Sequence, residues 1–277
     1  MKDQYAVIGN PIHHSWSPKI HQLFAEQTQQ ELDYKAILAP LDGFKHILKE
    51  FQNQGGKGLN ITLPFKQQAY QIVDTLSERA KLAKSINTIQ FNPDGTLFGD
   101  NTDGIGFIRD VVHNHNFSIS NKRVLILGAG GAVRGILHPL LQESPAQLII
   151  ANRTEETAKA LIEEFPHDPS IQTCSLSSLD QFKFDLVING TSASLTENTI
   201  DLPKNILSGQ AYCYDMVYGK GTTPFMAWAA ENNAMLISDG LGMLIEQAAE
   251  SFYIWRGIRP KTLNFSVLLL ECSGAFI

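Results

Sequence analysis

The sequence contains few cysteines and none in pairs. The three thiols, at Cys174, Cys213 and Cys272, lie far apart and form no C-x-x-C motif. This spacing argues against both a disulfide framework and a zinc site. We expect all three to be buried apolar fillers in a protein of a reducing compartment.

The sequence also lacks a long hydrophobic run and an excess of positive charge. No segment approaches the ~20 apolar residues of a membrane-spanning helix, and the polar residues 1–5 are not typical of a signal peptide. The net charge is −6, which disfavours general binding to nucleic acid or anionic membranes. We therefore expect a cytoplasmic protein that binds a small molecule, without a nucleic-acid or membrane partner.

The 277 residues, 43% of them hydrophobic, are enough for one large or two ordinary domains. In the first part of the chain, strand-like runs alternate with helical patterns, which predicts an open sheet with parallel strands. The expected strands are 5–9, 32–38 and 58–63, followed by a hairpin of 88–91 and 96–99. Two helices are expected between them, one with Ser17 as N-cap before Pro18 and one from Phe44.

A second alternating series follows the polar break at 118–121. Strands are expected at 123–127, 148–151, 184–189, 211–215 and 235–237, and helices at 105–114, 131–142, 154–165, 225–231, 240–255 and 263–270. The pattern is typical of a doubly wound fold. We assign the last two helices to the first sheet, which is short of helices on one side. The predicted fold class is therefore α/β, with two open-sheet domains: a discontinuous substrate domain of 1–103 plus 240–277, and a Rossmann-type domain of 104–239.

A glycine-rich loop opens the second series. The apolar strand that ends at Leu127 runs directly into Gly128, Ala129, Gly130, Gly131 and Ala132. Glycine permits the tight turn and lets the backbone approach a pyrophosphate at the helix N-terminus. Val133 departs from the strict G-x-G-x-x-G pattern, and a plain tight turn is the alternative interpretation.

The end of the next strand indicates which dinucleotide binds. An NAD site usually has an acidic residue there, whereas this chain has Asn152, Arg153 and Thr154. Arg153 can pair with a 2′-phosphate and no carboxylate repels one, which favours NADP. Glu155 and Glu156 follow, and we interpret them as helix acids favoured by the dipole.

A lysine and an aspartate suggest acid–base chemistry. Lys66 follows a strand and a Pro-Phe turn, and Asp103 opens a helix after the hairpin. Polar residues surround them at predicted strand ends, where open α/β sheets bind ligands: Asn60, Thr62, Asn87, Asn101 and Thr102. A lysine–aspartate pair can hold a proton beside a carbonyl or alcohol oxygen while hydride moves at the carbon. The alternative for Lys66 is an ordinary surface lysine.

Two serines and two histidines precede the first helix. Ser15 and Ser17 flank Trp16, and hydroxyls near a helix N-terminus suit a substrate carboxylate, although simple helix capping is the alternative. His13 and His14 are adjacent in a loop without partners at ligand spacing, so no metal site is expected.

Several motifs in the same order resemble the bacterial shikimate dehydrogenase family over essentially the whole chain. They are Gly9-Asn10-Pro11-Ile12 with Ser15 and Ser17, Asn60-Ile61-Thr62-Leu63-Pro64-Phe65-Lys66, Asn87-Thr88, Gly99-Asp100-Asn101-Thr102-Asp103-Gly104, the glycine loop, Asn152-Arg153-Thr154, Tyr214-Asp215-Met216-Val217-Tyr218, and Asp239-Gly240-Leu241-Gly242-Met243 with Gln247.

The resemblance implies reversible reduction of 3-dehydroshikimate to shikimate by NADPH, in the route to aromatic amino acids. It implies Lys66 as the acid–base residue and Asp103 as its partner. The substrate ligands that it implies are Ser15, Ser17, Thr62, Asn87, Tyr218 and Gln247. The cofactor surface that it implies comprises Glu78, Gly128, Ala129, Gly130, Gly131, Ala132, Asn152, Arg153, Thr154, Thr157, Met216 and Gly240.

One position departs from the family pattern. Many NADP-using members carry a second arginine where this chain has Thr157, so the phosphate clamp rests on Arg153 with help from Asn152 and Thr154. Two alternatives remain open: an NAD-preferring quinate/shikimate dehydrogenase of the same fold, and a non-catalytic nucleotide-sensing module. The expected assembly is a monomer or a homodimer.

Overall fold

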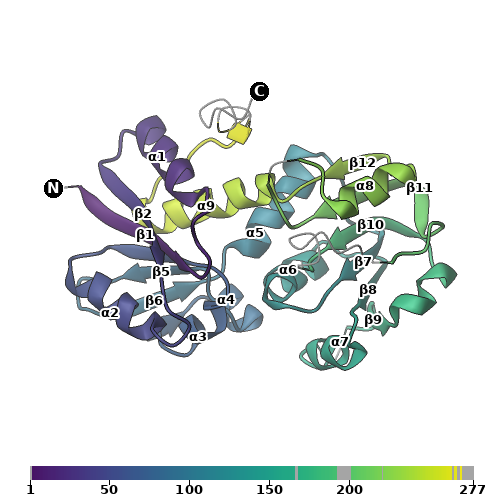
Figure 1. Ribbon diagram of the computed structural model, residues 1–277, viewed down its shortest axis with the longest axis horizontal. Helices are drawn as coiled ribbons and strands as arrows, with labels where there is room; N and C mark the ends of the chain where they lie inside the picture. The colour runs from purple at the N-terminus through teal and green to yellow at the C-terminus, as the bar shows by residue number, and fades with distance from the viewer. Residues whose placement is uncertain are drawn as a thin grey trace. The chain divides into compact units, whose positions relative to one another are not determined.

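The chain forms two six-stranded sheets, one in each of two structural units (Figure 1). This computed structural model describes residues 2–165, 168–191, 201–219, 221–263, 265–266 and 269. The units are Met1–Arg109 together with Leu244–Ile277, and Asp110–Met243. The predicted fold class, two open-sheet α/β domains, is confirmed. The predicted boundaries, 103/104 and 239/240, lie a few residues earlier in the chain than these divisions.

The sheet of the first unit is mixed. Its strands are β1 (Asp3–Gly9), β2 (Leu32–Leu38), β3 (Gly58–Ile61), β4 (Thr75–Leu76), β5 (Thr88–Phe91) and β6 (Leu97–Asp100), in the order β2-β1-β3-β5-β6-β4. Strand β1 pairs in parallel with β2 and β3, as predicted, whereas β5 is antiparallel to both β3 and β6. The antiparallel pairing follows from the short turn between β5 and β6, which can only return the chain in the opposite direction.

Helices cover both faces of this sheet (Figure 1). They are α1 (Ser17–Thr28), α2 (Phe44–Asn53), α3 (Lys66–Tyr70), α4 (Glu78–Ala83), α5 (Asp103–Ile108) and α9 (Leu241–Arg256). Phe44 and Phe65 pack with Ile8 in a core under α2 and α3. On the opposite face, Trp255 of α9 stacks on Tyr5 of β1, with ring centroids 4.7 Å apart. Successive residues of β1 thus face the two helix layers alternately.

The sheet of the second unit is entirely parallel. Its strands are β7 (Arg123–Leu127), β8 (Gln147–Ala151), β9 (Ile171–Cys174), β10 (Phe184–Asn189), β11 (Leu207–Asp215) and β12 (Leu236–Ser238), in the order β12-β11-β10-β7-β8-β9. The chain moves outward from β7 to β9, returns to β10 and moves outward again to β12. The direction therefore switches between β7 and β10, where such sheets bind ligands at the carboxyl ends of their strands.

The remaining helical elements follow the strands of the second unit. They are the π-helix η1 (Arg109–Asn114), α6 (Gly131–Gln142), α7 (Glu155–Ile162), the 3₁₀-helix η2 (Leu176–Gln181) and α8 (Pro224–Glu231). Leu179 of η2 and Phe225 of α8 pack in one core with Leu125 and Leu127 of β7. One face of the sheet is thereby covered by η2 and α8.

The predicted N-cap of the first helix was wrong. Helix α1 begins at Ser17 itself, and Trp16 occupies the N-cap position without a side-chain cap bond. The Oγ atom of Ser15 instead accepts the N–H of Ser17, at 3.3 Å. The Ser17 hydroxyl is therefore not used for capping.

The predicted helix 105–114 is divided in two. Helix α5 ends at Ile108, and the following segment is a π-helix in which the His115 N–H donates to the Asp110 carbonyl. The hydroxyl of Tyr214 donates to the buried Asp110 carboxylate at 2.7 Å. This anchor on a neighbouring strand fixes the wider turn, a constraint that the local pattern does not contain. Half of the residues of the predicted helix 263–270 lie outside the described residues.

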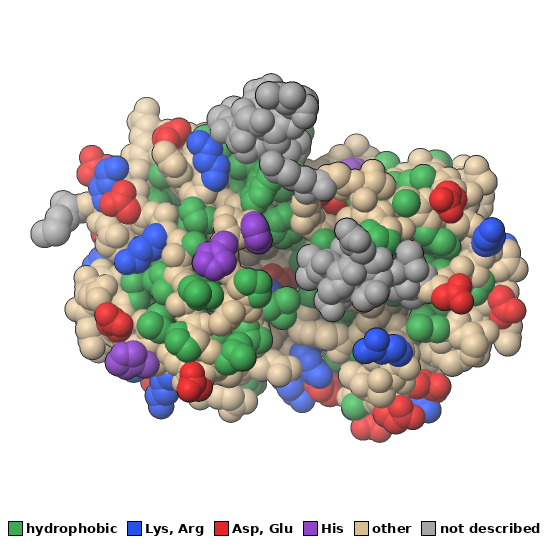
Figure 2. Space-filling model, viewed as in Figure 1, with side chains coloured by type: hydrophobic (Ala, Val, Ile, Leu, Met, Phe, Trp, Pro, Cys, Tyr) green, Lys and Arg blue, Asp and Glu red, His purple; other side chains and the backbone are tan. Residues whose placement is uncertain are grey.

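Within the described residues, no helix has the length and apolarity to cross a membrane. Nor do three His, Cys, Asp or Glu side chains gather there as possible metal ligands. Cys174 is half-buried and Cys213 is buried, and burial raises the pKa of both thiols, that of Cys213 to about 12. Cys272 lies outside the described residues. On the face in Figure 2, the described basic and acidic side chains are interspersed.

Candidate active site

The polar residues singled out in the sequence meet at one edge of the first sheet. Strands β1, β3 and β6 run in the same direction and end at this edge. Strand β5 runs the opposite way, so its first residue, Thr88, lies at the same edge between Asn60 and Asp100. The segments that leave or enter the sheet here carry Thr62, Lys66, Asn87 and Asp103.

Lys66 and Asp103 form an ion pair. The Nζ atom of Lys66 donates to Asp103 Oδ2 at 2.5 Å, and the two side chains are only 17% and 7% exposed. Each residue is the first of a short helix, Lys66 of α3 and Asp103 of α5. The N–H of Asp103 donates to the side-chain oxygen of Asn101 at 3.1 Å, which holds the start of α5. The acid therefore fixes the direction in which the ammonium group points.

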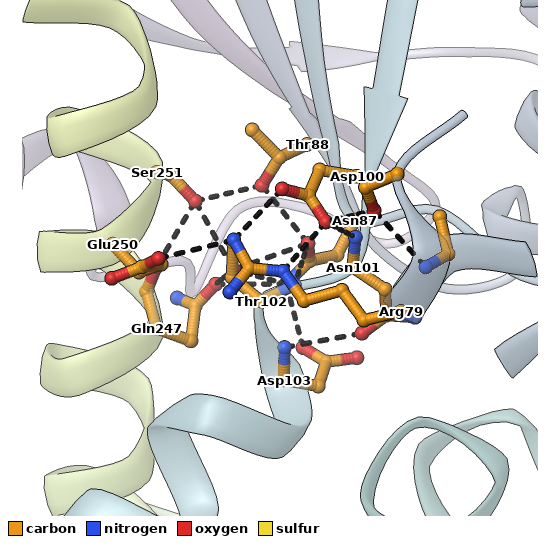
Figure 3. Close-up of polar contacts among 12 residues, drawn as sticks. Arg79, Asn87, Thr88, Asp100, Asn101, Thr102, Asp103, Gln247, Glu250 and Ser251 are labelled. Atoms are coloured by element: carbon orange, nitrogen blue, oxygen red, sulfur yellow. Dashed lines mark hydrogen bonds and ion pairs between the residues drawn. The ribbon is translucent and has the colours of Figure 1, made fainter. Parts of the chain in front are cut away.

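Asn87 lies at the centre of the polar cluster (Figure 3). Its Nδ2 atom donates to Asp103 Oδ1 at 2.8 Å and to Thr102 Oγ1 at 2.8 Å. Its Oδ1 atom accepts the N–H of Thr102 at 2.8 Å and the hydroxyl of Thr88 at 2.9 Å. Asn87 is 2% exposed, so the orientation of its amide is fixed at both ends by buried partners.

Helix α9 adds two polar side chains to this cluster. Gln247 Oε1 accepts from Asn87 Nδ2 at 3.1 Å, and Gln247 Nε2 donates to the Leu244 carbonyl at 2.8 Å. One turn later, the hydroxyl of Ser251 lies 2.7 Å from that of Thr88. The structure thus brings together four of the predicted site residues by direct bonds: Lys66, Asp103, Asn87 and Gln247.

Ser15, Ser17 and Thr62 lie in the same unit without direct bonds to that group. Ser17 is 6% exposed and hydrogen-bonds with Tyr34, whose pKa lies well above its ordinary value because the ring is buried. The hydroxyl of Tyr34 donates to Asn60 Oδ1 at 2.8 Å, and Asn60 Nδ2 donates to the Asn87 carbonyl at 3.0 Å. A buried hydrogen-bonded path therefore connects Ser17 with the cluster. Thr62 is half-buried, directly after β3.

The glycine loop lies at the switch point of the second sheet. Gly128 has a φ of +99°, which a residue with a side chain rarely adopts, and its N–H donates to the Ala151 carbonyl at 2.8 Å. The N–H of Gly190, after β10, donates to the Leu127 carbonyl at 2.9 Å. A Cβ atom on Gly130 or Gly131 would meet no atom of the described residues within 4 Å. The N-terminus of α6 is therefore open to an anionic ligand.

The predicted phosphate clamp is exposed at the end of β8. Arg153, Thr154 and Thr157 are all exposed, and Asn152 Nδ2 donates to the Thr154 carbonyl at 2.8 Å. Arg153 makes no hydrogen bond or ion pair within the described part of the chain. Its guanidinium is thus available to a phosphate at this position, as the choice of NADP requires.

Met216, which follows β11, and Gly240, which lies shortly after β12, are in contact. A Cβ atom on Gly240 would lie 2.4 Å from the Met216 carbonyl oxygen, and the Gly240 N–H donates to the Val217 carbonyl at 3.1 Å. Tyr218 follows in the same loop, and burial raises the pKa of its hydroxyl. Tyr218 belongs to the second unit, whereas the other five predicted substrate ligands belong to the first.

Comparison with known proteins gives the family. Family models match residues 7–89 (shikimate dehydrogenase substrate binding domain), 111–204 (shikimate / quinate 5-dehydrogenase) and 240–262 (shikimate 5'-dehydrogenase C-terminal domain). The protein named "Shikimate dehydrogenase (NADP(+))" of Laribacter hongkongensis is 53% identical over 262 residues, 95% of this chain and 96% of that relative. The chain belongs to the shikimate dehydrogenase family. The resemblance predicted from the motifs is confirmed, and so is the prediction of an enzyme.

Solved structures of the family share the whole fold. An Ael1 enzyme from Pseudomonas putida has a TM-score of 0.90 and 46% identity, with 98% of each chain covered. The shikimate 5-dehydrogenase of Thermus thermophilus, solved with NADP(H) and shikimate, has a TM-score of 0.86 and 30% identity. That likeness covers 99% of this chain and 100% of the other. Both sheets of this shikimate dehydrogenase family member therefore have counterparts in solved relatives.

One residue that the family resemblance assigned to the cofactor surface stands apart from the others. Glu78 is the first residue of α4, in the first unit, and its side chain is 84% exposed. Its carboxylate accepts from Lys81 Nζ at 2.6 Å. All the other predicted cofactor residues belong to the second unit. The assignment of Glu78 to the cofactor stays a prediction for this shikimate dehydrogenase family member.

Two residues of the cluster were not predicted as substrate ligands: Thr102, which the sequence placed among the polar residues around the pair, and Ser251, which it did not indicate. Thr102 contacts both Asn87 and Gln247, and Ser251 joins Asn60 to Thr88. Ser251 lies four residues after Gln247 in an otherwise apolar helix face, a spacing that could have indicated it. Arg79 carries no such signal, because α4 has only six residues.

Proposed function

We propose that the protein catalyses the reversible NADPH-dependent reduction of 3-dehydroshikimate to shikimate, with Lys66 and Asp103 as its acid–base pair. The coarser statement follows from family membership: the protein is an NADP-dependent shikimate dehydrogenase, like the named relatives. The observation that carries the finer proposal is the buried Lys66–Asp103 ion pair, surrounded by amide and hydroxyl groups.

The chemistry of the pair suits a ketone–alcohol interconversion. Bound NADPH supplies the hydride that reaches the carbonyl carbon. Lys66, as an ammonium group, then donates a proton to the carbonyl oxygen, and in the reverse direction the neutral amine accepts the proton of the hydroxyl. Asp103 keeps Nζ pointing at one place and balances its charge in the ammonium form. Water is not needed to carry the proton, because the lysine itself is the donor.

The neighbouring polar groups fit the remainder of a polyhydroxylated acid. Asn87 bonds to Asp103 and Gln247 bonds to Asn87, while Thr62 follows β3 at the same edge of the sheet, and each offers amide or hydroxyl groups to substrate hydroxyls. Ser15 and Ser17, at the start of α1, are assigned to the substrate carboxylate. Tyr218 is assigned to the substrate from the second unit.

Apart from Glu78, the residues assigned to the cofactor belong to the second unit. The open N-terminus of α6 would hold the pyrophosphate, and Arg153, with Asn152 and Thr154, would hold the 2′-phosphate. Met216 and Gly240 would line the rest of the dinucleotide site. No acidic residue stands at 152–154 to favour NAD.

The test is a turnover assay with the purified protein. Shikimate and quinate are each offered with NADP⁺ and with NAD⁺, and formation of the reduced cofactor is followed by absorbance. Of the four combinations, we expect shikimate with NADP⁺ to give the highest kcat/KM. Faster oxidation of quinate with NAD⁺ would identify the alternative enzyme of the same fold instead. No turnover with any of the four pairs would contradict both.

A further inference from the structure

A single arginine joins the two structural elements that carry the proposed site (Figure 3). Arg79, on α4, donates from Nε to Asp100 Oδ1 at 2.7 Å and from Nη2 to Asp100 Oδ2 at 2.8 Å. The same Nη2 donates to Glu250 Oε1, on α9, at 3.1 Å. Asp100 is 3% exposed, so its charge is balanced inside the protein. A bidentate arginine–carboxylate pair fixes orientation as well as distance.

The Asp100 end of this contact controls the segment that leads to Asp103. Asp100 Oδ1 also accepts the hydroxyl of Ser77 at 2.5 Å and the N–H of Asn101 at 2.7 Å. Asn101 in turn accepts the N–H of Asp103 at 3.1 Å and donates to the Ser85 carbonyl at 3.0 Å. The Asp100 carboxylate held by Arg79 thus fixes the N–H of Asn101, and the side chain of Asn101 in turn fixes the N–H of Asp103.

The Glu250 end controls helix α9. Glu250 lies three residues after Gln247, which contacts Asn87 and Thr102 of the site. The Oε2 atom of Glu250 is bound by Arg259, which also donates to Glu246 Oε2 at 2.8 Å. Arg109 Nε donates to Glu246 at 3.1 Å. One side of α9 is thus held by charges and the adjacent side by the polar cluster.

We propose that Arg79 is a positioning residue for shikimate: its guanidinium sets the distance between the Asp103 segment and the Gln247 helix. The inference rests on the proposed function, because it concerns the groups assigned to substrate. The hydrogen bonds and ion pairs of Arg79 within the described residues go to Asp100 and Glu250, not to Lys66 or Gln247. A lysine at position 79 keeps the charge but cannot make the two parallel bonds to Asp100 and a third to Glu250.

The main test compares two arginine-to-lysine variants. Arg123, in the second unit, makes the same kind of fork with Asp185, at 2.9 and 3.0 Å, far in sequence from the site residues of the first unit. Arg79→Lys is expected to lower kcat/KM for shikimate about 10- to 100-fold, largely through KM, because small displacements of binding groups have effects of this size. The KM for NADP⁺ is expected to remain unchanged. Arg123→Lys is expected to change neither constant.

A merely structural role gives a different result. If Arg79→Lys only lowers the melting temperature and kcat, with KM for shikimate unchanged, or if it matches Arg123→Lys, the inference is wrong. Equal increases in KM for shikimate and for NADP⁺ also overturn it. Should Arg79→Lys fail to fold, the KM values for shikimate and NADP⁺ are measured in Glu250→Gln instead. This variant is milder, because it removes the charge from only one partner of Arg79. A raised KM for shikimate alone supports the inference, and an unchanged KM overturns it.

A Lys66→Ala variant separates this inference from the proposed function. If the native enzyme oxidises shikimate, Lys66→Ala does not, and Arg79→Lys behaves as the native enzyme, only the inference fails. If the native enzyme does not oxidise shikimate, the proposed function fails and the positioning role fails with it.

Discussion

The position of Lys66 depends on the residue before it. Phe65 is fully buried and stacks on Phe44, with ring centroids 5.0 Å apart. The backbone carbonyl of Lys66 accepts the N–H of Ile86 at 3.0 Å. The lysine side chain therefore leaves a fixed backbone, and only its own torsions and Asp103 determine where Nζ lies. Substitution of the side chain alone should leave this anchor in place.

We predict that Lys66→Ala lowers kcat for shikimate by about 100- to 10,000-fold, the usual effect of losing a positioned acid–base group. Its fold should be retained, as circular dichroism and the melting temperature would report. Lys49→Ala is the matched control, because Lys49 is exposed and its Nζ contacts only Gln52, at 3.1 Å, in the described structure. Activity in Lys66→Ala close to that of the control would exclude the proposed role.

Arg153 should determine the choice between the two dinucleotides. A hydrogen bond to a charged group contributes about 1.5–3 kcal/mol, so Arg153→Ala is expected to weaken NADP⁺ binding by about 10- to 100-fold. NAD⁺ lacks the 2′-phosphate and should bind as before. Titration of each cofactor, followed by fluorescence or calorimetry, measures both constants.

The control for Arg153 is Lys159→Ala, which removes a nearby exposed positive charge on α7 that pairs with Glu155 at 2.8 Å. It should have little effect on either cofactor. If both cofactors lose affinity equally in Arg153→Ala, the arginine does not recognise the 2′-phosphate.

At the scale of elements, the carboxyl end of β11 is in direct contact with the residues that precede α9. A Cβ atom at position 240 would lie 2.4 Å from the carbonyl oxygen and 2.8 Å from the carbonyl carbon of Met216. Both atoms belong to the backbone, so neither can rotate away. The two segments must separate to accommodate any side chain there.

We therefore predict that Gly240→Ala destabilises the protein by about 1–3 kcal/mol, the usual range for overpacking. It should also raise the KM for NADP⁺, because Met216 is displaced. Gly209→Ala provides the comparison: Gly209 lies in the same strand, β11, near its other end, and a Cβ atom there would meet no described atom within 4 Å. Thermal unfolding and cofactor titration of the two variants are the measurements, and similar values for both would contradict the close contact.

Long, strongly patterned elements could be predicted from the sequence, and short ones could not. The strands Leu32–Leu38, Arg123–Leu127 and Phe184–Asn189 have the predicted limits, because stretches rich in apolar residues there are bounded by polar or turn residues. Helices α3 and α4 have five and six residues, too few for a helical period to be recognised. Arg79 was missed for this reason.

The candidate site was predictable in its residue types but not in its contacts. Lys66 and Asp103 are 37 residues apart, and nothing local indicates that they form an ion pair. The antiparallel direction of β5 decides which end of that strand meets the site, and it brings Asn87 to Asp103. Gln247 arrives from a helix at the other end of the chain. Such contacts depend on the topology, which the motifs imply only through the family.

At the scale of the whole molecule, one buried histidine should make stability depend on pH. His21 is 0% exposed and its ring stacks on that of Tyr34, with centroids 4.2 Å apart. Burial lowers the pKa of His21 from 6.5 to about 3. Between these values the unfolded chain binds a proton that the folded chain does not. Stability therefore falls as the pH is lowered through this window.

We predict that His21→Phe removes this dependence, because phenylalanine fits an aromatic environment and does not titrate. The difference in unfolding free energy between the variant and the native protein should grow as the pH falls from about 7 to about 4. Urea unfolding at a series of pH values measures it. Parallel curves for the two proteins would show that His21 is protonated in the folded state as easily as in the unfolded state.

The discontinuity of the first unit affects how the chain is made. Residues up to Arg109 are synthesised first, yet the face of their sheet that carries Tyr5, on which α1 also packs, is not fully covered until Phe252 and Trp255 have been synthesised. The second unit is continuous and needs no later segment for its sheet. Domains generally fold as units once their residues are available. The first unit begins to be translated before the second but can complete its fold only after it. Until α9 has been synthesised, the exposed aromatic side chains of the first unit are a surface that chaperones can bind.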